Sequence, residues 1–476
     1  MSNIANSSAG KRILSLLDEN SFVEIGAKVT ARATDFNLGQ AETPSDGVIT
    51  GYGVIDGNPV YVYSQDASVL GGSVGEMHAK KIANLYDLAI KTGAPVVGLL
   101  DSAGIRLQEA TDALEAFGTI YNKMALASGV IPQITAVFGN CGGGLAVLAG
   151  MSDITLMEES KGKLFVSSPN AIEGNNESKL DTASAAYQAK ETGVVDFVGD
   201  EASVLGQIRA YVSVLPSNNL EEADSDCTDD LNRAAADMAN CVGDTSIALS
   251  RIADDQAFYE LKSAYAPDMV TGLMKLDGIT VGAVANRTEV YGEDGTVAEK
   301  FDAVISCKGA KKAAEFVQFC DAFEIPVITL TNTTGFKATE CCEKNMAKNV
   351  AKLTYAFANA TVPKINVIIG KAFGSAYVAM NSKGIGADIT YAWSNAQIGC
   401  MDAKLAAKII SADKADEIDA TAKKYAELQN SVDAAAARGY VDTIIDAADT
   451  RKYVIGALEM LYTKSEDRPD KKHGTI

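Results

Sequence analysis

The chain has little histidine. Its 476 residues include two, His78 and His473, the second in a charged tail. A Ser-His-Asp or Cys-His mechanism would therefore have to use His78 or proceed without imidazole. Because a helix is predicted to begin beside His78, we interpret it as a helix-surface or capping residue. A catalytic His78 is the less favoured alternative.

Paired cysteine motifs are also missing. The eight cysteines show no Cys-x-x-Cys spacing, so neither a zinc site nor a redox dithiol is indicated, and we expect no metal in this chain. Most of the thiols should be small buried side chains in a reduced compartment. The adjacent pair Cys341 and Cys342 is unusual, and a redox role for it is the less favoured interpretation.

Long apolar runs and excess positive charge are absent as well. No apolar run reaches about 18 residues, and the polar N-terminal segment lacks a signal-peptide core, so we expect a cytoplasmic protein. The net charge of −20 argues against nucleic acid or an anionic membrane surface as a partner. No glycine loop is followed by the Lys-Ser/Thr pair of a nucleotide P-loop.

One pattern is present twice: a proline-led apolar strand that runs into a glycine-rich turn, at 131–144 and again at 362–376. A separation of 231 positions holds for three pairs of residues: Pro95 and Pro326, Pro132 and Pro363, Gly143 and Gly374. Further upstream, Gly51–Gly57 resembles Gly272–Gly278. One offset held across three elements predicts a domain duplication with two similar sites.

Strands alternate with helices in both halves, which favours an α/β fold of right-handed βαβ units with buried parallel strands. Strands are expected at 60–64, 96–100, 134–138, 279–285, 327–330 and 365–369, with helices at 76–91, 112–128, 311–323 and 346–360. The acidic segment 216–230 is the predicted boundary, which gives domains 1–230 and 231–476. A late helical block at 403–437 is expected to serve packing or subunit contact.

The glycine turns suggest a chemistry. A strand, two or three small residues and then a helix place unpaired backbone N–H groups at a helix N-terminus, and glycine allows close approach of a ligand. Such a turn could stabilise an oxyanion, bind phosphate, or simply connect a strand to a helix. Two turns and almost no histidine fit carbonyl reactants that pass through enolate-like states. Transfer of CO2 between a ureido ring and the α-carbon of an acyl thioester has this form.

Long motifs carry a family resemblance over nearly the whole chain. The segments LGGSVGEMH (70–78), DSAGIRLQE (101–109) and ASGVIPQI (127–134) resemble the N-terminal domain of biotin-dependent acyl-CoA carboxyltransferases. In the second half FCDAF (319–323), ATVPK (360–364) and KAFG (371–374) resemble the same family. The resemblance implies two tandem crotonase-like (ClpP/crotonase) domains, an active site between the domains of two subunits, and a homo-oligomer, commonly a hexamer.

The resemblance also implies roles for particular residues. The turn at Gly143 and Gly144 would hold the CoA thioester oxyanion, and the turn at Ser375 and Ala376 would hold the ureido oxygen of biotin, whose ring nitrogen acts as the base. The remaining expected site residues are Phe373, Gly374, Tyr377 and Val378 around biotin and the acyl group, and Gly71, Gly72, Ala103 and Gly104 on the CoA side.

Biotin is expected to arrive on another polypeptide, because the chain shows neither an ATP-grasp loop nor a biotinyl domain. Met274-Lys275 resembles a biotinylation pair, but it falls in a duplicated strand. The implied partners are a biotin carrier protein with either a biotin carboxylase or a membrane decarboxylase subunit, to which this chain would be peripheral. The direction of transfer is left open.

The turns depart from the family pattern. The family usually has CAGGA where this chain has CGGGL (141–145), and YGGAYD where it has FGSAYV (373–378). Ser375 still offers a backbone amide, whereas Val378 leaves the size of the acyl group open. The segment 166–195 lacks a Gly-Gly stretch, and we expect a shortened loop at 335–349.

Two alternatives remain open. A crotonase-type hydratase or isomerase without biotin would need a positioned carboxylate, for which Glu109, beside Asp101 and Arg106, is the candidate. A non-catalytic assembly subunit is the other alternative.

Overall fold

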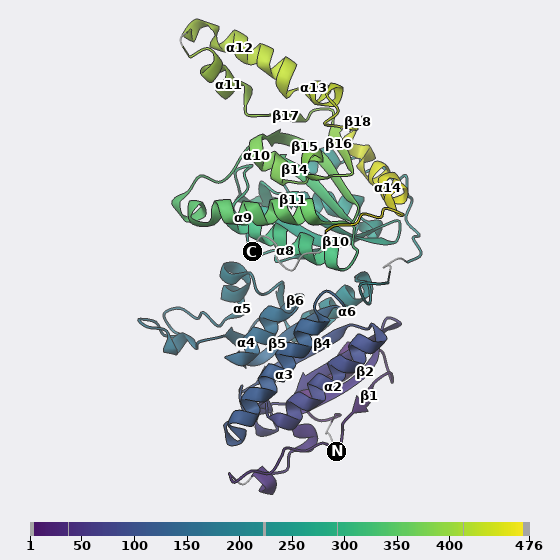
Figure 1. Ribbon diagram of the computed structural model, residues 1–476, viewed down its shortest axis with the longest axis vertical. Helices are drawn as coiled ribbons and strands as arrows, with labels where there is room; N and C mark the ends of the chain where they lie inside the picture. Colours follow the sequence, from purple (N-terminus) through teal and green to yellow (C-terminus); the bar gives the residue numbers. More distant parts are fainter. Residues whose placement is uncertain (1–3, 37, 222–224, 293, 413, 470–476) are drawn as a thin grey trace. The chain divides into compact units, whose positions relative to one another are not determined.

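The computed structural model describes residues 4–36, 38–221, 225–292, 294–412 and 414–469, so His473 lies outside the described part. The chain forms two compact units, Met1–Ala223 and Asp224–Ile476 (Figure 1). Each unit is built on its own eight-stranded sheet.

The first unit has the strand order β1-β2-β3-β4-β5-β6-β8, with β7 also paired to β5. The strands are β1 (Val23–Ile25), β2 (Val48–Ile55), β3 (Asn58–Gln65), β4 (Val96–Ser102), β5 (Gln133–Gly142), β6 (Ile154–Glu158), β7 (Lys163–Phe165) and β8 (Phe197–Gly199). The pairs β1–β2 and β2–β3 are antiparallel, and the pairs from β3 onward are parallel.

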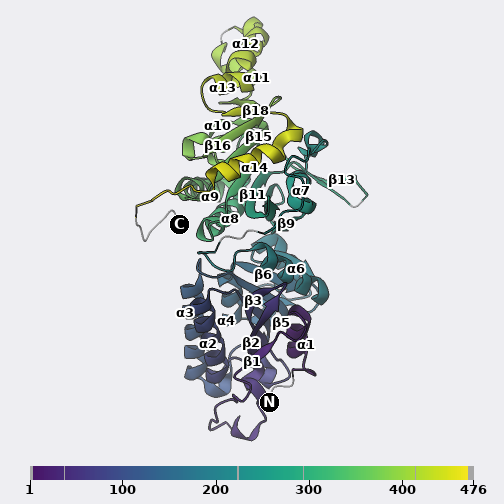
Figure 2. The same ribbon diagram turned by 90° about the vertical axis from the view of Figure 1, so that its right-hand side faces the viewer.

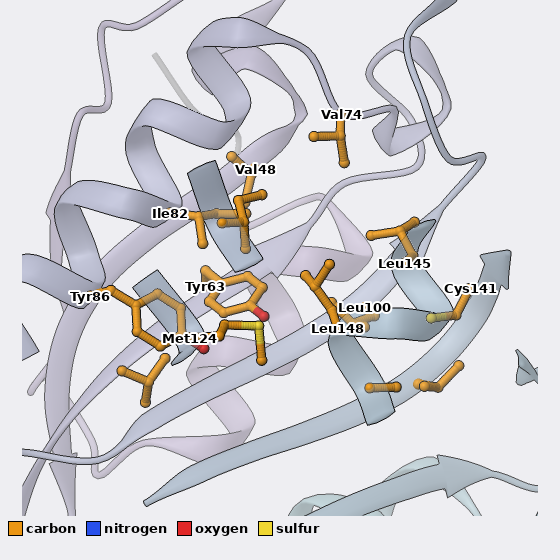
Figure 3. Close-up of a cluster of buried hydrophobic side chains, with 14 of the residues drawn as sticks. Val48, Tyr63, Val74, Ile82, Tyr86, Leu100, Met124, Cys141, Leu145 and Leu148 are labelled. Atoms are coloured by element: carbon orange, nitrogen blue, oxygen red, sulfur yellow. The ribbon is translucent and has the colours of Figure 1, made fainter. Parts of the chain in front are cut away.

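Helices cover both faces of this sheet (Figure 2). One face carries α2 (Glu76–Thr92), α3 (Thr111–Ala127) and α4 (Gly144–Met151), and the other carries α1 (Ser8–Leu16) and α6 (Glu201–Val214). Tyr63 and Tyr86 lie in the core between α2 and the sheet, with Met124, Leu145 and Leu148 (Figure 3). Burial of each such side chain stabilises the fold by about 1.5–3 kcal/mol.

The second unit repeats this arrangement in the order β9-β10-β11-β14-β15-β16-β18, with β17 also paired to β15. Its strands are β9 (Phe258–Leu261), β10 (Met269–Leu276), β11 (Ile279–Asn286), β14 (Val327–Thr333), β15 (Lys364–Phe373), β16 (Ile389–Trp393), β17 (Gln397–Gly399) and β18 (Thr443–Ile445); β12 (Glu289–Tyr291) and β13 (Val297–Lys300) form a separate ribbon. The principal helices are α7 (Thr245–Ile252), α8 (Cys307–Ala322), α9 (Glu340–Asn359), α10 (Gly374–Ala379) and α14 (Thr450–Leu461).

The predicted late helical block is confirmed as α11 (Ala403–Ile410), α12 (Ile418–Tyr425) and α13 (Val432–Ala437). Figure 1 shows α11 and α12 extending beyond the sheet of the second unit. We call 403–437 the helical arm. Within the described residues no helix is both long and apolar enough to cross a membrane.

The duplication predicted from the sequence is confirmed by the turns. The hairpin β2–β3 turns at Asp56-Gly57 and the hairpin β10–β11 at Asp277-Gly278, all four residues with positive φ. This is the pattern of a two-residue type I′ turn, which an Asp-Gly pair favours. Met274 lies in β10, as expected for a duplicated strand.

Aspartates fix the parallel strands in the same way in both units. The backbone N–H of Gln133 donates to Asp153 and that of Lys364 donates to Asp388, each at 2.8 Å. One strand further along, Thr155 N–H donates to Asp196, also at 2.8 Å. The matching bond in the second unit runs from Thr390 N–H to Asp442 at 2.8 Å.

Two local expectations were wrong. The helix expected at 346–360 begins earlier, at Glu340, so the loop expected at 335–349 ends at Thr339. The side chain of Thr339 accepts the N–H of Cys342 as an N-cap, and Glu340 and Glu343 favour the first turn. His78 is fully buried in α2 and is not a surface residue.

Candidate active site

The first glycine turn lies between β5 and α4. Gly143 has φ 59° and ψ −121°, a backbone conformation that favours glycine. Its N–H donates to Phe165 O at 2.9 Å and is therefore engaged. Gly144 opens α4, where backbone N–H groups have no acceptor within the helix. Of the two amides expected at this turn, that of Gly143 is therefore already paired, and that of Gly144 stands at the start of the helix.

A pocket of about 850 Å³ opens in front of this turn. Its lining includes Ala103 and Gly104 with Gly143 and Gly144, so four of the expected residues come together. The other lining residues are Ser102, Ile105, Leu114, Phe117, Gly118, Tyr121, Asn140, Gly142 and Phe165. The volume is typical of small-molecule sites.

Gly71 and Gly72, expected on the CoA side, lie behind the pocket and do not line it. The carbonyl of Gly71 accepts the N–H of Ala103 at 2.8 Å. A Cβ on Gly72 would lie 2.5 Å from the carbonyl oxygen of Asp101. These glycines therefore allow the 70–75 loop to pack against the loop that carries Ala103.

Two aromatic side chains of α3 hold the turn from the other side. The hydroxyl of Tyr121 donates to Gly144 O at 2.7 Å. A Cβ on Gly144 would lie 2.9 Å from the Tyr121 hydroxyl and 3.1 Å from the Phe117 ring. The sequence provided no signal for these contacts, since Phe117 and Tyr121 read as ordinary residues of an amphipathic helix.

A buried ionic cluster lies beside the loop that carries Ala103 and Gly104. Arg106 Nη1 contacts Asp46 Oδ1 at 2.5 Å and Glu109 Oε1 at 2.9 Å, and all three side chains are fully buried. Glu109 also accepts the N–H of Glu76, the first residue of α2, at 2.6 Å. Burial raises the pKa of Asp46, although Arg106 opposes the shift. Glu109 is thus committed to the fold, which disfavours the hydratase alternative.

His78 belongs to the same buried region. Its Nδ1 lies 3.0 Å from Asp46 O, and its Nε2 lies 3.2 Å from Gln65 Nε2. Burial and the charge of Arg106 lower the pKa of His78 to about 3, so the ring is neutral at physiological pH. His78 is not among the residues that line the pocket.

The second turn lies between β15 and α10. Gly374, 231 positions after Gly143, has φ 62°, close to the 59° of Gly143. Ser375 takes the place of Gly144. Phe373 and Ala376 are almost fully buried behind the turn, with exposed fractions of 2% and 1%.

A pocket of about 700 Å³ opens at this turn. Of the expected residues, Gly374, Ser375, Tyr377 and Val378 line it, whereas Phe373 and Ala376 do not. Burial raises the pKa of Tyr377 to about 12, so its hydroxyl stays protonated. The remaining lining residues are Ser382, Lys383, Gly384, Ile398, Gly399, Cys400, Tyr425, Gln429, Ala435, Arg438 and Tyr440.

The helical arm contributes residues that the sequence did not assign to a site. Tyr425, Gln429 and Ala435 reach this pocket from the arm, and Arg438 and Tyr440 directly follow it. The Arg438 guanidinium donates to Leu428 O at 3.0 Å. The sequence of the arm indicated packing or subunit contact, because nothing in it distinguishes pocket-lining positions.

Each unit has a mixed sheet whose parallel strands include one that ends in a glycine turn beside an open pocket. This arrangement, present twice in one chain, is that of an α/β protein with two crotonase-like domains. The Carboxyl transferase domain model matches residues 6–476, and the chain belongs to this family. It is a biotin-dependent carboxyltransferase.

Similar proteins span the same length. The chain is 38% identical over 481 residues to methylmalonyl-CoA decarboxylase subunit alpha of Veillonella parvula, covering 98% of this chain and 92% of the relative. It is 38% identical over 484 residues to the propionyl-CoA carboxylase beta chain of Roseobacter denitrificans, covering 98% and 93%. The structure matches that of transcarboxylase 12S with hydrolysed methylmalonyl-CoA bound, at a TM-score of 0.91 and 35% identity, over 99% and 93% of the two chains.

Proposed function

We propose that this chain is the subunit that moves a carboxyl group between carrier-bound biotin and the α-carbon of a short-chain acyl-CoA, with propionyl- and methylmalonyl-CoA as the preferred pair. The observation that carries this proposal is the pocket in which Ala103 and Gly104 meet the Gly143-Gly144 turn. The relatives named for methylmalonyl-CoA and propionyl-CoA support the acyl group. Residues 1–230 form the acyl-CoA domain and 231–476 the biotin domain.

In the first domain the thioester oxygen lies at the Gly144 amide. When the bond at the α-carbon forms or breaks, negative charge develops on this oxygen, and a fixed N–H donor stabilises it. Removal of one such donor typically costs about 3–4 kcal/mol of barrier. Tyr121 holds the Gly144 carbonyl and so fixes the orientation of the turn. The apolar side chains of Leu114 and Phe117 exclude water around the enolate-like state.

The second pocket fits the ureido ring of biotin. Its volume suits a small bicyclic ligand, and the Ser375-Ala376 turn provides backbone amides beside the apolar side chains of Tyr377, Val378 and Ile398. Biotin supplies the ring nitrogen that bears the carboxyl group and exchanges the proton of the acyl α-carbon. Ser375 orients the ureido oxygen. The side chain of Phe373, buried behind the turn, supports it from the sheet side.

The partners are a biotin carrier protein and either a biotin carboxylase or a membrane decarboxylase subunit. We propose a homohexamer in the cytoplasm, peripheral to a membrane complex if the partner is a decarboxylase. The exposed apolar residues Leu405, Ile409 and Ile410 of the helical arm support subunit contact, with exposed fractions of 52%, 63% and 63%. A hexamer is also described for transcarboxylase 12S.

A panel of carboxyl donors tests the proposal. The purified chain is incubated with a biotinylated carrier protein and malonyl-, methylmalonyl- or glutaconyl-CoA, and carboxyl transfer to the carrier is measured. We expect methylmalonyl-CoA to be the best donor. Hydration of an enoyl-CoA without any transfer would support the hydratase alternative, and a stable complex without transfer would support an assembly role. Co-purification with a biotin carboxylase or a membrane decarboxylase subunit decides the direction.

A further inference from the structure

The loop 333–339 of the second unit matches the loop 102–108 of the first, but different side chains lie beneath it. The backbone contacts are the same in both units: Val74 N–H donates to Gly104 O at 2.8 Å, and Ile305 N–H donates to Gly335 O at 2.9 Å. Lys337, however, stands 231 positions after Arg106 and is exposed. The second unit therefore does not repeat the buried arginine that anchors this loop in the first.

Thiols occupy the matching helix N-termini. Cys307, the first residue of α8, stands 231 positions after Glu76, the first residue of α2. Cys342 in the first turn of α9 stands 231 positions after Thr111, the first residue of α3. In the first unit a carboxylate accepts the N–H of Glu76 at 2.6 Å. In the second unit the Cys342 thiol lies near the start of α8, and the backbone of Cys307 lowers the pKa of that thiol.

The two thiols are buried together. Cys307 and Cys342 have exposed fractions of 7% and 8%, and they form one cluster with Met346, against which Phe336 and Val350 pack. Each thiol also shifts the pKa of the other, as expected for side chains that lie close together. Cys341, the neighbour of Cys342, is exposed and lies outside this cluster.

Their environments make the two thiols unequal. Burial acts to raise the pKa of Cys342, but hydrogen bonds with Cys307 and Thr339 and the charge of Lys337 outweigh it, so the pKa lies below its ordinary value. Burial raises the pKa of Cys307. A more ionised thiol beside a protonated one matches the attacking and resolving cysteines of redox sites.

We propose that Cys307 and Cys342 are a redox-modification site, at which a hydroperoxide converts the two thiols into a disulfide that joins the first turns of α8 and α9. The Cys342 thiolate attacks one peroxide oxygen, the O–O bond breaks, and the leaving hydroxide or alkoxide takes up a proton. The resulting sulfenic acid is attacked by the Cys307 sulfur. The S–S bond forms as the S–O bond breaks, and water leaves with the proton of Cys307. Two electrons pass from the thiols to the peroxide.

The disulfide would act on the loop at 333–339. Phe336 packs on the thiol pair, and Thr333 pairs with Ala372 of β15, two residues before Gly374. In the first unit the matching loop lines the substrate pocket beside Gly143. We expect displacement of Phe336 to reach the Gly374 turn through Thr333 and Ala372, because residues 333–339 do not themselves line the second pocket. The expected loss of carboxyl transfer rests on the function proposed above.

Peptide mapping tests the site without reference to activity. The reduced full-length chain is treated with hydrogen peroxide, remaining thiols are alkylated, and cross-linked peptides are identified by mass spectrometry. We expect a Cys307–Cys342 cross-link that dithiothreitol reverses. Cys342→Ser should abolish it, and the matched control Cys341→Ser should retain it. Complete alkylation of Cys307 after peroxide treatment, with oxidation confined to Cys341, would overturn the proposal.

Activity tests the link to the pocket. Oxidised wild type should lose carboxyl transfer about 10-fold or more, since loss of a single backbone donor costs about 100-fold. Dithiothreitol should restore it, and Cys342→Ser should resist peroxide. Cross-linked protein with unchanged transfer would overturn the link to the pocket. A chain that shows no transfer in either the reduced or the oxidised state would contradict the proposed function. The presence or absence of the Cys307–Cys342 cross-link would still test the proposed redox site.

Discussion

Replacement of Gly143 by alanine separates the role of the first turn in the reaction from its role in the fold. Gly143 has φ 59°, and a Cβ built on it meets no atom within 4 Å, so the substitution causes backbone strain without a steric clash. A residue held in such a conformation costs about 1–3 kcal/mol. Relief of this strain rotates the peptide that leads to the Gly144 amide, and the new methyl group projects into the pocket.

We expect Gly143→Ala to lower the free energy of unfolding by about 1–3 kcal/mol. We expect carboxyl transfer to fall by about 10²–10³, as for loss of one oxyanion donor. Gly174→Ala is the matched control, because Gly174 has φ 73°, also meets nothing within 4 Å and does not line the pocket. Urea unfolding monitored by circular dichroism and the transfer assay are applied to both variants. Equal activity in the two variants would refute the assignment of this turn.

Three further predictions follow from the first unit. Gly118→Leu should raise KM for the acyl-CoA in the transfer assay, because Gly118 lines the pocket, and should stabilise α3 by about 1 kcal/mol, because glycine is a poor helix former. The control Gly206→Leu changes another helical glycine with open space around it and should leave KM unchanged. Arg106→Met should lower the free energy of unfolding in urea by about 3–5 kcal/mol, because two buried carboxylates lose their partner. Arg251→Met, at a half-exposed ion pair, should lower it by less than about 1 kcal/mol. Similar losses in the two variants would contradict the structure. Burial raises the pKa of Asp153 to about 7, so between about pH 4 and pH 7 the unfolded state is ionised at this residue while the folded state is not, and the free energy of unfolding falls as the pH rises. The variant Asp153→Asn should lack this part of the fall when unfolding is measured across the range. Parallel pH dependences in wild type and variant would contradict the prediction.

The order of strands and helices was predictable because the duplication repeats each element with its turn. Gly143 and Gly374 could be paired by their spacing, and the structure gives them nearly equal φ values. Asp56 and Asp277 could be paired in the same way, because each begins an Asp-Gly hairpin turn. Local signals of this kind survive in any tertiary context, since only a few residues can adopt these conformations.

What the sequence could not provide depends on contacts between distant segments. His78 is buried because Asp46 and Gln65, from other elements, pack around it. Tyr121 contacts Gly144 because α3 packs against α4. Side-chain pattern along one helix shows which face is apolar but not which neighbour that face meets.

Each sheet takes all its strands from its own unit, and this has a consequence for synthesis. The last strand of the first sheet, β8, ends at Gly199, and the first strand of the second sheet, β9, begins at Phe258. The first sheet can therefore be completed on the ribosome before any strand of the second has emerged. At about 5–20 residues per second, the rest of the chain takes on the order of tens of seconds to translate. Until Gly374 has been added, a nascent chain would carry a finished first glycine turn without the second one.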